Sequence, residues 1–140
     1  MEHARQVAEV AAVLEAAFSA AGFMVTVVGG SAIEIHAPGI HRSGDIDLVL
    51  RRRHSGQATL EEIFRGLGFR KAGRHWRHGD TLFVELVSGP VAGPEEMVRV
   101  GEAPFRVVKK EVVLRDRVVG FKHWAEPVGL LEGIQEPDPS

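Results

Sequence analysis

The run Phe23 to Val28 constrains the fold more than any other part of the chain. Its residues are mostly β-branched, a glycine precedes it, and Gly29 and Gly30 follow at once. A short run of this composition between glycines is typical of a strand buried inside a sheet. Residues 31–36 then favour a short helix, which Pro38 interrupts. The sequence therefore predicts a strand that turns sharply into a helix.

Apolar residues at helical spacing mark two further helices. One covers Val7 to Phe18, with Gly22 placed to close it. The other covers Leu60 to Leu67, and Thr59 and Glu62 stand three apart as a capping pair at its start.

Further strands are predicted at Asp45 to Leu50, 69–72, 81–87 and 105–108. Residues 111–124 carry both strand and helix signals, and we favour a helix there. We therefore expect an α/β (α+β) fold with a mixed sheet of four or five strands flanked by helices.

The composition suits one compact domain. The chain has 140 residues, is 44% apolar and carries a net charge of -2, so no global cationic field is available to attract nucleic acid. We expect a single domain over residues 1–135, followed by a frayed tail at 136–140. Cysteine is absent, and no apolar run reaches membrane-spanning length. We expect an unprocessed cytoplasmic protein without membrane contact.

Three carboxylates stand out as candidate metal ligands. Asp45 and Asp47 are two apart in a predicted strand, so both side chains leave the same face. Like charges this close raise each other's pKa, a cost that a divalent cation removes. Glu85 lies in a run apolar on both faces, where an unpaired charge also needs a metal or another partner. We name Asp45, Asp47 and Glu85 the acidic triad, and its oxygens suit Mg²⁺ or Mn²⁺.

Gly29, Gly30 and Ser31, which we name the glycine turn, form a candidate phosphate site. They stand between strand and helix, where glycines admit close approach and the helix start offers free amide donors. The Ser31 hydroxyl is a further donor. Arg42, just before the aspartates, is a candidate for a bidentate phosphate contact.

The order of these features resembles the nucleotidyltransferase superfamily. Its pattern is a hydrophobic residue with Gly-Gly or Gly-Ser, then Asp-hydrophobic-Asp, then a later strand that carries Asp or Glu. The matching segments are Val28 to Ser31, Asp45 to Leu48 and Val84 to Leu86. With Arg42 to Val49 included, the pattern is similar to small bacterial stand-alone nucleotidyltransferase-like proteins, some of which belong to toxin-antitoxin systems.

The resemblance implies that the acidic triad binds two Mg²⁺ or Mn²⁺ ions, which hold a nucleoside triphosphate and activate an acceptor hydroxyl. It also implies that the glycine turn holds phosphates. The expected activity is transfer of a nucleotidyl group to a hydroxyl on protein, RNA or a small molecule.

Other interpretations stay open. The two aspartates also suit a solvated strand end, and Glu85 suits a salt bridge with Arg70, Lys71 or Arg74. No acceptor motif follows Pro90, which is compatible with a non-catalytic binding or regulatory module such as one component of a toxin-antitoxin pair. An aminoglycoside-type modifying enzyme is a third candidate.

Two basic or histidine-rich stretches are less informative. His75 and His78 are three apart in a predicted hairpin, so they point to opposite faces, and we expect no zinc site. The arginines at 51–53, with those at 70–77, suit RNA or nucleotide phosphates, although such runs are commonly solvated. Lys122 is a further candidate for contact with a triphosphate.

Overall fold

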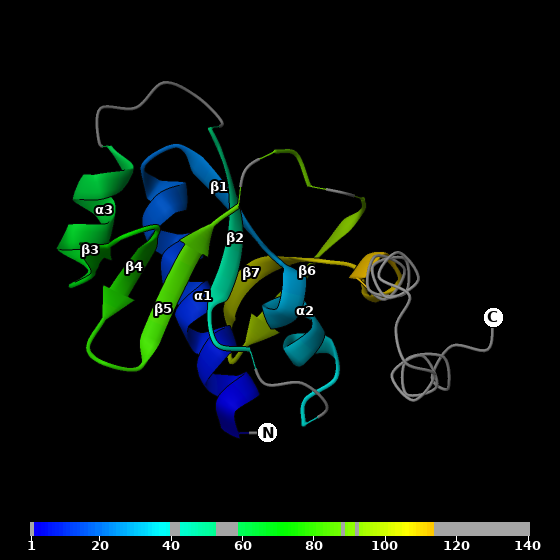
Figure 1. Cartoon of the computed structure of the whole chain (residues 1–140). Helices are drawn as coiled ribbons and strands as arrows, with labels where there is room; N and C mark the ends of the chain where they lie inside the picture. The colour runs from blue at the N-terminus through cyan, green and yellow to red at the C-terminus, as the bar shows by residue number, and fades with distance from the viewer. Residues whose placement is uncertain (1, 40–42, 53–58, 88, 92, 114–140) are drawn as a thin grey trace.

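A mixed β-sheet forms the centre of the computed structural model, which describes residues 2–39, 43–52, 59–87, 89–91 and 93–113. Within these ranges the sheet has seven strands in the order β3-β4-β5-β2-β1-β7-β6 (Figure 1). Along the chain, the elements are α1 (Glu2–Ala20), β1 (Phe23–Val28), α2 (Gly29–His36), β2 (Ile46–Arg52), α3 (Leu60–Gly66), β3 (Arg70–Ala72), β4 (His75–His78), β5 (Leu82–Leu86), β6 (Glu95–Val100) and β7 (Ala103–Val108).

The central strands β1 and β2 place the glycine turn beside the first two carboxylates. They pair antiparallel, with Val28 opposite Asp47, so the end of β1 lies next to the beginning of β2. On its other side β2 pairs parallel with β5, and β1 pairs parallel with β7. The mixed sheet that the sequence predicts is therefore confirmed.

Helix α1 covers one face of the sheet and builds the core with it (Figure 1). Its buried face includes Leu14 and Phe18, which are fully buried and belong to one apolar cluster with the β1 residues Val25 and Val27. Burial of such side chains contributes about 25 cal/mol per Å² of apolar surface removed from water. The core thus fixes which residues of β1 and β2 face α1 and which face away from it.

The helices and strands predicted in the first half of the chain are present, although α1 begins at Glu2 rather than near Val7. The strand Phe23–Val28 has the predicted bounds. The Thr59 hydroxyl accepts a hydrogen bond from the Glu62 backbone N–H, and the Glu62 side chain accepts one from Thr59 N–H, so the predicted capping pair is confirmed. Within the predicted helix over 111–124, residues 111–113 are described, and they lie in a helical turn.

The sheet is larger than predicted, with seven strands rather than four or five. The two additional strands are β4, whose residues the sequence places in a hairpin without separate bounds, and β6. Trp76 is the one buried residue of β4, and β6 has none, so neither strand shows a continuous apolar run. Backbone pairing to β5 and β7 joins them to the sheet, and apolar periodicity does not reveal such pairing.

Several predictions fall on residues that lie outside the described ranges. These include Arg42, Lys122 and the tail at 136–140. Among the helices in the described part of the chain, none is both long and apolar enough to span a membrane.

Candidate functional site

The acidic triad gathers on the sheet face opposite α1. Asp47 is the second residue of β2, and its neighbours Ile46 and Leu48 are both buried in the core. In the parallel pair of β2 and β5, Asp47 lies directly beside Glu85. Asp45 precedes β2 by one residue and lies near enough for its charge to act on Asp47. The expectation that these three carboxylates share one region agrees with their positions.

The glycine turn holds Asp47 in place. Gly29 adopts a φ of +62°, and a Cβ at this position would lie 2.7 Å from Asp47 Oδ2. The backbone N–H of Gly30 donates a hydrogen bond to the Asp47 carboxylate. The Asp47 N–H donates to Ser31 Oγ at 3.0 Å, and the same hydroxyl donates to Val28 O at 2.9 Å. The fully buried Ser31 side chain therefore ties the turn to β2.

The electrostatics of Asp47 are those of a crowded anionic site. Burial, then the charges of Glu85 and Asp45, raise the pKa of Asp47 to about 6. The hydrogen bond from Gly30 and the nearby His75 oppose the increase without cancelling it. Ionised Asp47 is thus destabilised until a positive charge binds nearby.

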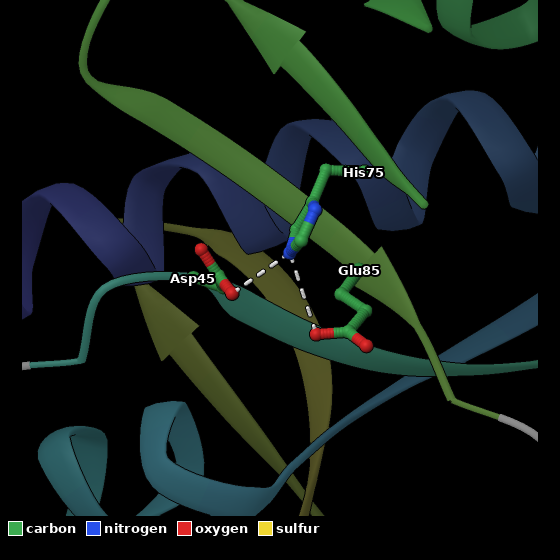
Figure 2. Close-up of side chains that lie close together, drawn as sticks. All are labelled: Asp45, His75 and Glu85. Atoms are coloured by element: carbon green, nitrogen blue, oxygen red, sulfur yellow. Dashed lines mark hydrogen bonds and ion pairs between the residues drawn. The ribbon is translucent and has the colours of Figure 1, made fainter. Parts of the chain in front are cut away.

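His75 completes the cluster, although the sequence prediction left it out of the site. Its Nε2 lies 3.1 Å from Asp45 Oδ2 and 3.5 Å from Glu85 Oε1. Figure 2 shows the imidazole pointing from β4 toward the two carboxylates, in front of the sheet. One ligand atom from each of these three residues lies within 4.8 Å of the others. The pairing of His75 opposite Glu85 in β4 and β5 produces this contact.

The two histidines of β4 do lie on opposite faces, as predicted. The His78 ring packs edge-on against Phe69, with ring centroids 5.2 Å apart. His78 also lines a hollow beside α1, together with Val10 and Leu14. His75 and His78 therefore do not share a site, and His75 instead contacts carboxylates that lie outside β4.

Glu85 lies on an interior strand, as predicted, but its side chain is half-buried, with 28% exposed. Among the described residues, Arg74 is the one arginine or lysine paired with it, at 3.9 Å from Arg74 Nη2 to Glu85 Oε2. The Arg74 side chain is 85% exposed, and exposed pairs at such distances contribute little. The salt-bridge alternative for Glu85 is present in this weak form.

A second polar cluster holds Ser43, which lies two residues before Asp45 in the chain. Glu34 of α2 is buried, and its Oε1 accepts hydrogen bonds from both Ser43 N–H, at 2.9 Å, and the Ser43 hydroxyl, at 3.0 Å. His3 of α1 contacts its other oxygen. Although burial raises the pKa of Glu34, these hydrogen bonds hold it below the ordinary value. An acid within an apolar helix is the one sign of this cluster in the sequence.

An apolar cavity of about 270 Å³ opens beside the glycine turn. Val28 and Val49, which flank Asp47 on the same face of the sheet, line it. The cavity places apolar surface directly next to the charged cluster. Its other lining residues include Ile33, Val87, Val91 and Val108.

The fold is similar to a known one. No protein-family model and no curated protein matches the sequence. Among solved structures, the chain resembles the crystal structure of an antigenic nucleotidyltransferase-like protein from Paracoccidioides brasiliensis, with a TM-score of 0.62 and 15% sequence identity. The match covers 81% of this chain and 65% of that protein, so the chain spans slightly less than two thirds of its length.

At this identity the likeness concerns the fold, and it confirms that the fold is nucleotidyltransferase-like. The cluster of Asp45, His75 and Glu85 fits a divalent metal ion. The chain therefore combines a nucleotidyltransferase-like fold with a candidate metal centre.

Proposed function

We propose that this chain is a metal-dependent nucleotidyltransferase, which transfers a nucleotidyl group from a nucleoside triphosphate to an acceptor hydroxyl. The observation that carries the proposal is the register of β2 and β5, which sets Asp47 beside Glu85 directly under the glycine turn. The nucleotidyltransferase-like fold supports it independently.

The donor set fits Mg²⁺ or Mn²⁺. Asp45, Asp47 and Glu85 offer hard carboxylate oxygens, which these ions prefer. Burial, and then repulsion from Glu85 and Asp45, raise the pKa of Asp47, and a bound cation would offset both costs of its ionised form. The acidic triad would hold the metal. When bound, the metal would neutralise phosphate charge and lower the pKa of the acceptor hydroxyl.

In the proposed reaction, the acceptor oxygen attacks the α-phosphorus of the triphosphate. A new phosphorus–oxygen bond forms, the bond to the β-phosphate oxygen breaks, and pyrophosphate leaves. Asp47 or Glu85 accepts the hydroxyl proton. The glycine turn, with Gly29 exposed, offers backbone for close approach of phosphate, and Arg42 is assigned as a further phosphate contact. We assign the acceptor to protein, RNA or a small molecule.

The second candidate is a non-catalytic binding or regulatory module with the same fold, such as a component of a toxin-antitoxin pair. One observation favours it: His75 lies between Asp45 and Glu85, where a protonated imidazole would neutralise part of the site without any metal. This module would keep the geometry of the acidic triad and lack nucleotidyl transfer.

Calorimetric titration tests the proposed function. ATP with Mg²⁺ or Mn²⁺ is titrated into wild type, Asp47→Asn and Asp80→Asn, the last removing an exposed carboxylate from the turn between β4 and β5. We expect metal-dependent binding to wild type and Asp80→Asn and much weaker binding to Asp47→Asn. Absence of metal-dependent binding to wild type would contradict the proposal.

Incubation with α-labelled triphosphates and cell extract separates the enzyme from the module. Transfer of label by wild type and Asp80→Asn, lost in Asp45→Ala, is the result expected of an enzyme. Metal-dependent nucleotide binding without labelled product favours the non-catalytic module.

A further inference from the structure

We propose that His75 is a ligand to the same metal as Asp45 and Glu85, and that this imidazole makes the site prefer Mn²⁺ over Mg²⁺. The inference rests on the proposed function, because it concerns the metal that the acidic triad would hold. It adds a nitrogen donor to a site otherwise built from carboxylates.

The distances suit ligands of a single ion. Ligands at about 2.1 Å from one octahedral ion lie roughly 3 Å apart when adjacent and roughly 4 Å apart when opposite. The imidazole Nε2 lies 3.1 Å from Asp45 Oδ2 and 3.5 Å from Glu85 Oε1. These two distances match adjacent ligands of one ion, and the three donor atoms, which converge in Figure 2, lie within 4.8 Å of one another.

Strand pairing places the His75 imidazole at this position. His75 pairs with Glu85 across β4 and β5, and Glu85 pairs with Asp47 across β5 and β2, so the three lie in one row across adjacent strands. Paired residues on neighbouring strands project from the same face. Backbone hydrogen bonds of the sheet thus hold His75 in line with the carboxylates, with its side chain 29% exposed.

The combination of nitrogen and oxygen donors favours Mn²⁺ over Mg²⁺. Mg²⁺ takes oxygen ligands and retains water, and imidazole is a ligand of transition metals. Mn²⁺ is a first-row transition metal that also suits carboxylate oxygen. A neutral imidazole added to two or three carboxylates therefore strengthens Mn²⁺ binding more than Mg²⁺ binding. A protonated imidazole that merely pairs with the carboxylates would oppose both ions equally.

Electron spin echo envelope modulation of bound Mn²⁺ detects a directly coordinated nitrogen, independently of any activity. The samples are wild type, His75→Gln and the matched control His78→Gln, whose histidine lies on the opposite face of the same strand against Phe69. We expect ¹⁴N modulation in wild type and His78→Gln, and its loss in His75→Gln. We expect Mn²⁺ affinity to fall at least roughly tenfold in His75→Gln, with a smaller change for Mg²⁺.

A second measurement tests for a histidine ligand to Mn²⁺ even where His75→Gln fails to fold. Wild type labelled with ¹⁵N-histidine changes the modulation pattern if a histidine binds the metal. Bound Mn²⁺ without histidine nitrogen modulation overturns this inference and leaves the proposed function standing. No binding of Mn²⁺ to wild type, with or without ATP, overturns both.

Discussion

Replacing Gly29 by alanine tests how closely the glycine turn supports Asp47. The φ of +62° costs an L-residue roughly 1–2 kcal/mol. The new Cβ would lie 2.7 Å from Asp47 Oδ2, whereas ordinary van der Waals contact begins near 3.4 Å, so the carboxylate must move. Weakening its hydrogen bond from Gly30 adds about 1.5 kcal/mol. We expect the free energy of unfolding to fall by roughly 3 kcal/mol.

Gly101→Ala is the matched control for this change. Gly101 has a φ of +63° in the turn between β6 and β7, and a Cβ there meets nothing within 4 Å. Urea unfolding should show a loss of roughly 1–2 kcal/mol for Gly101→Ala, which carries the backbone cost alone. Titration with Mn²⁺ should show weakened binding in Gly29→Ala and unchanged binding in Gly101→Ala. Equal destabilisation by the two substitutions, with equal Mn²⁺ affinity, would refute the reasoning.

Three further predictions concern single carboxylates and their partners. Because the folded pKa of Asp47 is raised from 3.8 to about 6, its ionised form costs stability that grows as pH rises through this window. Asp47→Asn should therefore stabilise the metal-free protein at pH 7, by about 1–2 kcal/mol after allowance for solvent screening, while it weakens metal binding. Denaturation with and without Mn²⁺ checks both effects. Glu34 has a lowered pKa, so its contribution is present above its ordinary value of 4.5 and is lost as pH falls through the folded value. The pH dependence of unfolding below 4.5 should be shallower in Glu34→Gln than in wild type. Arg74→Ala should change the free energy of unfolding by less than about 0.5 kcal/mol, because the ion pair with Glu85 is exposed; a larger loss in urea titration would restore the salt-bridge interpretation of Glu85.

Local chemistry made part of this fold predictable from sequence. A β-branched run between glycines gave the bounds of β1, and the spacing of Thr59 and Glu62 gave the start of α3. The strands β4 and β6 were not predictable in the same way. Of their residues only Trp76 is buried, so apolar pattern marks them weakly, and their pairing with β5 and β7 is not encoded in a local pattern.

Part of the candidate site was likewise predictable from sequence, and part was not. Asp45 and Asp47 share a face because of the two-residue period of a strand, which sequence reveals. The neighbour of Asp47 on β5 depends on register between strands far apart in sequence. For Glu85, the local sign of a site was its place in a run that is apolar on both faces. His75 reaches the carboxylates through two successive pairings, β4 with β5 and β5 with β2. Its proximity to Asp45 is a property of the assembled sheet.

The row formed by His75, Glu85 and Asp47 bears on how ions of different radius would fit the site. The three residues are anchored on adjacent hydrogen-bonded strands, so the spacing of their Cα atoms is set by the sheet. An ion that needs longer bonds, such as Ca²⁺ at roughly 2.3–2.6 Å, requires the strands to separate or the side chains to withdraw. Because the strands are hydrogen-bonded to one another, the side chains rather than the backbone would make this adjustment.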